Sequence, residues 1–541
     1  MIRLYVILFK ILVVRSVVIQ TPNGDISGST SNGVDIYLGI RYGDISERWS
    51  PAQLPLAWTG IINATSFSSI CYQLGPYELP QPYPESEHCL FLNIWVPQHV
   101  TSSPVRVWFH GGGYTAGAGS DYDSQELARL SGSIVVTINY RLGSFGFFNL
   151  PFTSDVNVGW LDQQLALKWI QANIGAFGGD KTNVMLFGQS AGGSSVLAHL
   201  LMPASWPLYS KVIMQSVGPF ILPDCKESEQ RNIELLEKYY PECHSNLTCI
   251  RTMNASVFNQ RLKNENINWI DFWPCVGGRS QLRAQPLALI RKGEYKKVPI
   301  LAGITYNEGQ SVALSFNQFQ IEMNSTRYRQ LASQYKIPAE FTSIYDKPGD
   351  YFSAFSGLFG DYHISCPSMA LFNRLSPSIY VYSFVHATEK WAFTPFHFNA
   401  THSTDIPYVF YNQFASTNFT VEEASLSKRL IEYFKIFHLN GSPLWPAYEN
   451  NQTVLVLDFD IKSQFSLGER LLEYCPRILK YLEKYDCEVY STSQTCLEID
   501  NCQWIDEKCQ APSPSSASRI LYHDYLFVLL ILFSGNFLYW S

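Results

Sequence analysis

The chain has 541 residues, of which 46% are hydrophobic and 15% aromatic, which excludes an intrinsically disordered protein and allows a large buried core. Charged residues make up 16%, below the roughly 25% that is typical of soluble domains. The net charge of −7 excludes the basic surface that DNA or RNA binding requires.

Residues 1–16 predict a signal peptide. Arg3 precedes an apolar stretch that Lys10 interrupts, and Ser16 is a small residue suited to cleavage. A short buried helix or strand is the alternative. The chain also carries N-x-S/T sequons, which are acceptors for N-glycosylation in an exported protein. We expect glycans at seven of them, and set aside an eighth at Asn440, which Pro443 follows; the seven are Asn63, Asn246, Asn254, Asn324, Asn399, Asn418 and Asn451.

The twelve cysteines also favour export. They lie in local groups without the C-x-x-C spacing of zinc sites, so we expect disulfides and no metal. One local group comprises Cys71 and Cys89, a second comprises Cys243 and Cys249, and a third comprises Cys487, Cys496, Cys502 and Cys509. Cys225 and Cys275 are left open, either as a pair or as free buried thiols.

Between residues 17 and 485, short runs rich in Val, Ile and aromatic residues alternate with helical segments. This alternation predicts an α/β fold, with a large mostly parallel central sheet and helices on both faces. The expected strands span residues 105–109, 134–138, 184–187, 299–304, 379–385 and 454–458. Four of them lead into motifs with chemistry: HGGG at 110–113, GQSAG at 188–192, YNEG at 306–309, and a loop holding His402. The carboxyl ends of parallel strands meet at one edge, so these motifs are expected to converge.

Ser190, in the GQSAG motif, is the expected nucleophile. The apolar run VMLF enters the motif and SSVLAHLL leaves it, which predicts the strand, tight turn and helix of a nucleophile elbow. Glycines 188 and 192 are needed where strand and helix approach closely.

A serine hydroxyl needs a base, and the base needs an orienting acid. In this fold the acid and then the histidine follow the serine, an order that Glu308 and His402 satisfy. The expected oxyanion donors are the backbone N–H groups of Gly112, Gly113 and Ala191. The rivals are His397 for the base and Asp405 for the acid, because both lie near His402 in the sequence.

The C-terminal segments predict a surface attachment. Residues 486–510 hold four cysteines in a small cysteine-rich module, which we interpret as a spacer. Residues 511–525 are a Pro/Ser linker with a possible lipid-anchor site, and residues 526–541 form an apolar tail. A transmembrane helix is the alternative, although the tail is shorter than the roughly 20 residues of a span.

The motifs resemble those of the type-B carboxylesterase and cholinesterase family of α/β-hydrolases, over residues 18–485. The segment FGGDKTNVMLFGQSAG (177–192) is similar to the serine signature of the family, and SEHCLFLNIWVP (86–97) to its second signature, with His88 where an acidic residue is usual. The resemblance implies Ser190, Glu308 and His402 as catalytic triad, with Gly112, Gly113 and Ala191 in the oxyanion hole.

The resemblance also implies structural pairs. These are the disulfides Cys71–Cys89, Cys243–Cys249 and Cys366–Cys475, and the buried ion pairs Arg48–Glu87 and Arg141–Asp180.

Two departures from cholinesterases bear on the substrate. Gln189 replaces the glutamate that precedes the serine in those enzymes, and the loop from Cys71 to Cys89 holds no Trp for gripping a quaternary ammonium. Gln310, Ser311 and Val312 stand where cholinesterases tend to carry aromatic residues. We therefore expect a neutral ester, although Tyr77 and Tyr83 can still supply a partial aromatic wall. Trp269 and Phe272 (and Trp273 beside them) are acyl-pocket candidates, with ordinary core packing as the alternative.

The sequence thus predicts a secreted or cell-surface serine carboxylesterase that works through an acyl-enzyme without metal or organic cofactor. Its expected partners are a small ester substrate and, through the tail or lipid anchor, a membrane; the sequence makes no prediction of oligomeric state. The alternatives are a cholinesterase-like enzyme and a catalytically weak adhesion protein on the same fold.

Overall fold

The computed structural model describes residues 15–74, 82–218, 221–243, 246–264, 269–315, 323–375, 379–388, 400–412, 419–448, 454–458, 462–464, 471, 473–480, 503–505 and 508–510. The chain divides into two compact units, Met1–Ile478 and Leu479–Ser541. The second contributes one short antiparallel pair of strands, β14 (Gln503–Ile505) and β15 (Lys508–Gln510).

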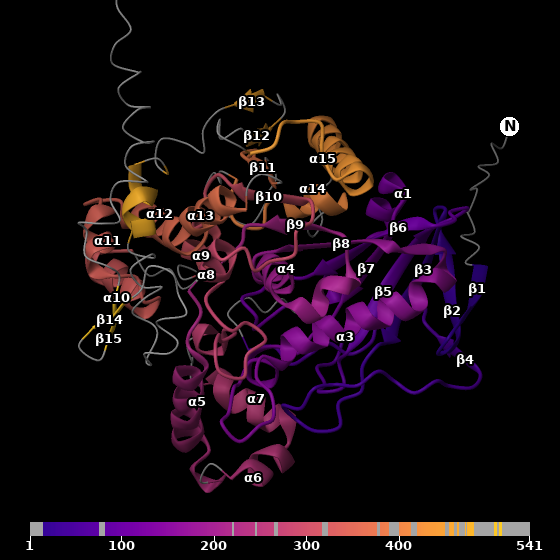
Figure 1. Cartoon of the computed structure of the whole chain (residues 1–541), viewed down its shortest axis with the longest axis horizontal. Helices are drawn as coiled ribbons and strands as arrows, with labels where there is room; N and C mark the ends of the chain where they lie inside the picture. Colours follow the sequence, from indigo (N-terminus) through magenta and orange to yellow (C-terminus); the bar gives the residue numbers. More distant parts are fainter. Residues whose placement is uncertain are drawn as a thin grey trace, which may run out of the picture. The chain divides into compact units, whose positions relative to one another are not determined.

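The first unit is built on one mixed sheet, which comprises thirteen strands among the described residues (Figure 1). Its order is β1-β2-β3-β5-β7-β6-β8-β9-β10-β11-β12-β13, with β4 beside β2. The strands are β1 (Arg15–Thr21), β2 (Gly24–Ser31), β3 (Val34–Arg41), β4 (Ile61–Asn63), β5 (Phe91–Pro97), β6 (Ser103–Phe109), β7 (Ile134–Ile138), β8 (Gly179–Gln189), β9 (Lys211–Gln215), β10 (Ile300–Thr305), β11 (Ile379–Phe384), β12 (Val454–Leu457) and β13 (Lys462–Gln464).

The centre of the sheet is parallel. Every neighbouring pair from β7 through β12 runs parallel, whereas β1, β2, β3 and β5 pair antiparallel at one side and β13 at the other. All residues of β7 and β10 are buried, as expected for strands covered on both faces. The six strands expected from the sequence are confirmed as β6, β7, β8, β10, β11 and β12.

Helices cover both faces of the sheet (Figure 1). One hydrophobic cluster joins Trp108 and Phe187 of the sheet to Phe434 of α15. The helices are α1 (Gln125–Ser131), α2 (Gly143–Gly146), α3 (Val158–Asn173), α4 (Ala191–Leu201), α5 (Cys225–Tyr239), α6 (Leu247–Thr252), α7 (Ala255–Asn264), α8 (Pro286–Arg291), α9 (Gln310–Ser315), α10 (Ser325–Gln334), α11 (Ala339–Ile344), α12 (Tyr351–Gly360), α13 (Cys366–Arg374), α14 (Ile406–Phe410) and α15 (Val421–Asn440).

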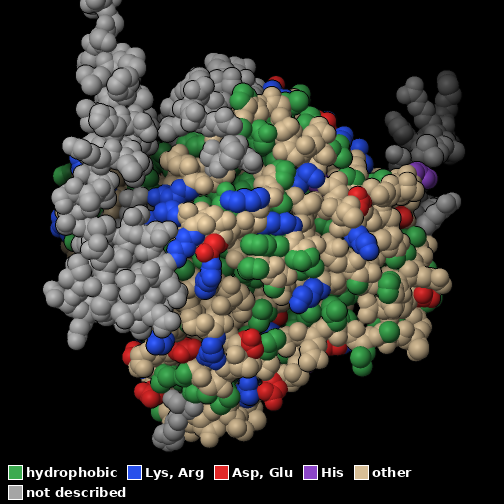
Figure 2. Space-filling model, in the orientation of Figure 1, with side chains coloured by type: hydrophobic (Ala, Val, Ile, Leu, Met, Phe, Trp, Pro, Cys, Tyr) green, Lys and Arg blue, Asp and Glu red, His purple; other side chains and the backbone are tan. Residues whose placement is uncertain are grey.

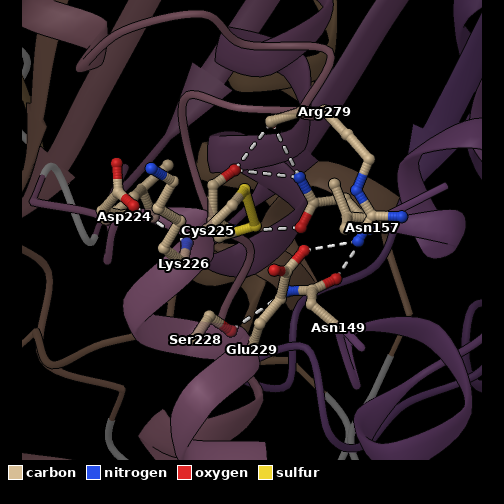
Figure 3. Close-up of a disulfide and its surroundings, with 12 residues drawn as sticks. Asn149, Asn157, Asp224, Cys225, Lys226, Ser228, Glu229 and Arg279 are labelled. Atoms are coloured by element: carbon tan, nitrogen blue, oxygen red, sulfur yellow. Dashed lines mark hydrogen bonds and ion pairs between the residues drawn. A yellow bond between two sulfur atoms is a disulfide. The ribbon is translucent and has the colours of Figure 1, made fainter. Parts of the chain in front are cut away.

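Four disulfides lie in the described part of the chain. Three are the pairs that the resemblance implies, Cys71–Cys89, Cys243–Cys249 and Cys366–Cys475. The fourth joins Cys225 to Cys275, which the sequence left open. Figure 3 shows its surroundings: the side chain of Asn157 accepts from the Cys275 N–H and donates to the Cys275 carbonyl, both at 2.9 Å.

The two expected buried ion pairs have different outcomes. Arg48 pairs with Glu87 at 2.8 Å, as expected, but the pair is only partly buried because the Glu87 side chain is 29% exposed. The expectation for Arg141 was wrong, because its guanidinium binds Asp162 of α3 at 2.7 Å instead of Asp180. Asp162 is fully buried and accepts hydrogen bonds from both Nε and Nη2 of Arg141. Asp180 instead accepts a hydrogen bond from the Thr182 hydroxyl at the start of β8. A buried guanidinium requires a buried partner, which Asp180 is not.

The chain ends fall mostly outside the described residues. Residues 1–14, 511–525 and the tail at 526–541 lie there, as does most of the expected module at 486–510. β1 begins at Arg15, so it includes the last two residues of the expected signal peptide. Among the described residues, no helix combines the length and apolar character needed to cross a membrane.

On the face of the molecule shown in Figure 2, acidic side chains lie among the basic ones.

Candidate active site

Ser190 forms the turn between β8 and α4. β8 ends at Gln189 and α4 begins at Ala191, so one residue makes the whole connection. Its backbone has φ 58° and ψ −125°, and its N–H donates to the carbonyl of Gln215 at 2.9 Å. A positive φ costs a non-glycine residue about 1–3 kcal/mol and is typical of functional sites. The expected nucleophile therefore sits in the strained elbow that the motif predicts.

Two glycines allow this turn. A Cβ atom on Gly192 would lie 1.9 Å from the carbonyl oxygen of Phe109, at the end of β6. A Cβ on Gly188 would lie 2.5 Å from the carbonyl oxygen of Gly192. Because both positions are closed by backbone atoms, neither can relax around a side chain, and the G-x-S-x-G spacing is a steric requirement of this elbow.

The HGGG motif lies against the elbow. A Cβ on Gly111 would be 3.1 Å from the Cβ of Ser190, and Gly112 and Gly113 both have positive φ, 104° and 62°. Within the described residues, no hydrogen bond uses the backbone N–H groups of Gly112, Gly113 or Ala191. These three N–H groups are therefore available as donors to an oxyanion.

His110, the first residue of the HGGG motif, supports the glycine loop by packing and hydrogen bonds. Its Nδ1–H donates to the Gly111 carbonyl at 2.8 Å, and its ring stacks on Tyr140 with 4.4 Å between centroids. The hydroxyl of Tyr140 donates to the His110 carbonyl at 2.8 Å. Burial lowers the pKa of His110 to about 4, so its ring is neutral at physiological pH and acts as a packed support.

Glu308 and His402 meet at the carboxyl end of the sheet. The Nδ1–H of His402 donates to Glu308 Oε2 at 2.6 Å. Their loops are joined by the N–H of Asn307, which donates to the Ala400 carbonyl at 2.8 Å. The other carboxylate oxygen of Glu308 accepts from the N–H of Thr305 and the hydroxyl of Ser216, both at 2.7 Å.

The rival acid, Asp405, has other hydrogen-bond partners. Asp405 accepts from the Gln215 amide at 2.7 Å and from the Tyr382 hydroxyl at 3.0 Å. Burial raises the pKa of its carboxyl, and the Glu308 charge raises it further. Within the described residues, no hydrogen bond joins Asp405 to His402, and the carboxylate that is hydrogen-bonded to the imidazole is that of Glu308. The rival base, His397, lies outside the described residues.

Two contacts were not foreseen from the sequence. Ser216, which supports Glu308, carries no motif of its own; its only signal is its place directly after β9. The other contact is that of Gln189, whose amide Nε2 lies 3.1 Å from His402 Nε2. Within the described residues, no hydrogen bond joins the Ser190 hydroxyl to His402.

The candidate substrate-pocket residues have different surroundings, and some lie outside the described residues. Phe272 is fully buried against Phe148, with 6.0 Å between ring centroids, which favours the core-packing alternative. Trp269 begins the short 3-10 helix at Trp269–Phe272, but its side chain lies outside the described set. Tyr83 packs edge-on against Phe67, and Tyr77 lies outside the described residues. Ser311 lies beside the site, with its hydroxyl donating to the His402 carbonyl at 3.4 Å.

The arrangement suits acyl transfer. A serine on a strained turn, an imidazole tied to a buried carboxylate, and three free N–H groups together match the parts needed to form and stabilise a tetrahedral intermediate. Among the described residues, no group of three or more His, Cys, Asp or Glu side chains is arranged to hold a metal ion.

Comparison with known proteins agrees with this chemistry. The sequence profile described as "Carboxylesterase family" matches residues 15–473. The chain is 31% identical to the acylcarnitine hydrolase of Mus musculus over 493 residues (81% of this chain, 87% of the relative). It is 30% identical to the cholinesterase of Mus musculus over 501 residues (80% and 82%). A solved structure of a PNB esterase superposes with a TM-score of 0.72 at 30% identity, covering 82% of this chain and 96% of that one.

Proposed function

This chain belongs to the carboxylesterase family and is a carboxylic ester hydrolase; we propose that it works through Ser190, Glu308 and His402 by way of an acyl-enzyme. The observation that carries the proposal is the 2.6 Å contact between His402 Nδ1 and Glu308, formed beside the Ser190 elbow. A carboxylate in this contact fixes the tautomer, so that Nε2 of the imidazole can accept a proton.

The reaction has two halves. Ser190 Oγ attacks the ester carbonyl carbon while His402 Nε2 takes the hydroxyl proton, and the tetrahedral oxyanion is stabilised by the N–H groups of Gly112, Gly113 and Ala191. The intermediate collapses with loss of the alcohol, which receives the proton from His402. Water then attacks the acyl-enzyme with His402 as base. The bond between the acyl carbon and Ser190 Oγ breaks, His402 returns the proton to Ser190 Oγ, and the carboxylic acid leaves.

The test of this function is hydrolysis of p-nitrophenyl acetate by the purified protein and its Ser190→Ala variant. We expect the variant to lose at least about 10³-fold in kcat, since it lacks the nucleophile. Equal rates in the two proteins would contradict the esterase mechanism and favour the adhesion alternative.

For the substrate, we propose an uncharged ester. Gln189 carries no charge to attract a quaternary ammonium, and no Trp lies between Cys71 and Cys89. The relatives do not decide the matter, because their names specify an acylcarnitine hydrolase, a cholinesterase and a pyrethroid hydrolase. Butyrylthiocholine and its uncharged carbon isostere should be hydrolysed with similar kcat/KM. A large preference for the charged ester would overturn this proposal.

We also propose that the protein is secreted or held at the outer cell surface. The four disulfides favour an oxidising compartment. Of the seven expected glycosylation sites, the four in the described part are all exposed, as glycosylation requires; they are Asn63, Asn246, Asn254 and Asn324. For attachment, a lipid anchor would be released from cells by a phosphatidylinositol-specific phospholipase, whereas a transmembrane tail would resist it.

A further inference from the structure

The second ring nitrogen of His402 already has a partner. Nδ1 lies 2.6 Å from a Glu308 oxygen that can only accept, so Nδ1 carries the proton of the neutral imidazole. Nε2 then has one lone pair and no hydrogen. The nitrogen of the Gln189 amide lies 3.1 Å from Nε2, and it can only donate. The lone pair that would take the proton of Ser190 is therefore occupied by Gln189.

The amide is confined in this position. Gln189 is 1% exposed, and its backbone is paired with Gln215 in the sheet. On the other side, a Cβ added to Gly111 would lie 3.0 Å from Gln189 Oε1, so the amide sits between the glycine loop and the imidazole. Burial and neighbours on both sides restrict the rotamers that would carry the amide away from His402.

We propose that Gln189 is a positioning residue that occupies Nε2 of His402 in the free enzyme, and that this hydrogen bond must break before His402 can take the proton of Ser190. The inference rests on the proposed function, since it concerns the base of that mechanism. Once His402 has taken the serine proton, its Nε2–H faces the amide N–H, and two donors cannot bond each other. The contact with Gln189 thus stabilises the ground state and not the transition state, and such a contact slows the reaction.

The expected effect is modest. A neutral hydrogen bond contributes about 1 kcal/mol net, which corresponds to about a fivefold change in rate. Removing the amide donor should therefore accelerate acylation of Ser190 about fivefold. If Gln189 has only a packing role, replacing it should slow the reaction or leave its rate unchanged.

The experiment uses the full-length protein and measures the second-order rate constant for covalent labelling of Ser190 by a fluorophosphonate, together with kcat and KM for p-nitrophenyl acetate. Gln189→Met keeps the length of the side chain without a donor, and Gln189→Asn withdraws the amide by one methylene. The control is Gln163→Met. Gln163 is also fully buried, and it contacts His199 Nε2 at 3.1 Å and the Ser195 hydroxyl at 2.9 Å, outside the site.

We expect both Gln189 variants to label faster and to gain in kcat, with the Gln163 control unchanged per folded molecule. Either folded Gln189 variant with a rate equal to or below wild type would overturn the proposal, and the Asn variant carries the test if the Met variant does not fold. The Ser190→Ala variant distinguishes a failure of the Gln189 proposal from a failure of the proposed function. Labelling of wild type that does not depend on Ser190 would instead overturn the proposed function.

Discussion

At the scale of single residues, the site depends on where each hydrogen bond of His402 goes. Its Nδ1 faces a carboxylate whose second oxygen takes both a backbone N–H and the Ser216 hydroxyl. Glu308 is fully buried, and a buried carboxylate needs hydrogen-bond donors to offset its lost hydration. The two donors to its second oxygen also fix the position from which it accepts the imidazole N–H. Sequence order predicted the contact between Glu308 and His402. It could not predict Ser216 or the contact of Gln189, because both depend on how separate strands bring side chains together.

Replacing Glu308 by Gln should lower kcat for p-nitrophenyl acetate by about 10³–10⁴-fold with little change in KM. The amide can donate to His402 and would favour the wrong tautomer. Glu126→Gln is the matched control, since Glu126 pairs with Arg129 on the surface. A Glu308→Gln variant that keeps a tenth of the wild-type kcat would exclude Glu308 as the orienting acid.

Ser216→Ala should have a smaller effect. Glu308 keeps the N–H of Thr305, so only one of the two donors to Oε1 is lost. We expect kcat/KM to fall about tenfold, as for about 1.4 kcal/mol of lost orientation. Steady-state kinetics on the same ester checks this, and an unchanged kcat/KM would show that Thr305 alone suffices.

At the scale of elements, periodicity and composition predicted the six strands that lead to or flank the site, because local runs of Val, Ile and aromatic residues determine them. Pairing across elements was less predictable. Arg141 was expected to bind Asp180, yet it binds Asp162 on α3, and both side chains of this pair are buried. Charge alone does not distinguish two aspartates in one chain; burial does.

This difference gives a stability test. Asp162→Asn leaves a buried guanidinium without its counter-charge and should lower the free energy of unfolding by about 3–5 kcal/mol. Asp180→Asn, at the start of β8, should change it by less than about 1 kcal/mol. Urea denaturation of both variants measures the two changes in unfolding free energy. A larger loss for Asp180→Asn than for Asp162→Asn would instead support the Arg141–Asp180 pair that the family resemblance implied.

At the scale of the whole molecule, buried histidines make stability depend on pH. Burial lowers the pKa of His199 to about 3 and that of His110 to about 4. In the unfolded chain a histidine titrates near about 6.5. Below that pH the unfolded state therefore binds protons that the native state does not, and stability falls as the pH decreases from about 6.5 toward about 4.

Each such histidine should contribute a slope of about 1.4 kcal/mol per pH unit in this window. His199→Asn removes one of them, so the unfolding free energy of the variant should fall less steeply with decreasing pH than that of wild type. Denaturation at a series of pH values from 7 to 5 measures the two slopes. Identical slopes would mean that His199 is protonated in the native state.

In the proposed mechanism, the hydroxyl of Ser190 attacks the acyl carbon with His402 as its base. Mass spectrometry after reaction with a fluorophosphonate tests it most directly, on wild type and on a His402→Ala variant. We predict one added phosphonyl group on the peptide that contains Ser190 in wild type, and labelling at least about 10³-fold slower in the variant. Modification at another residue, or equal labelling rates in the two proteins, would contradict this mechanism.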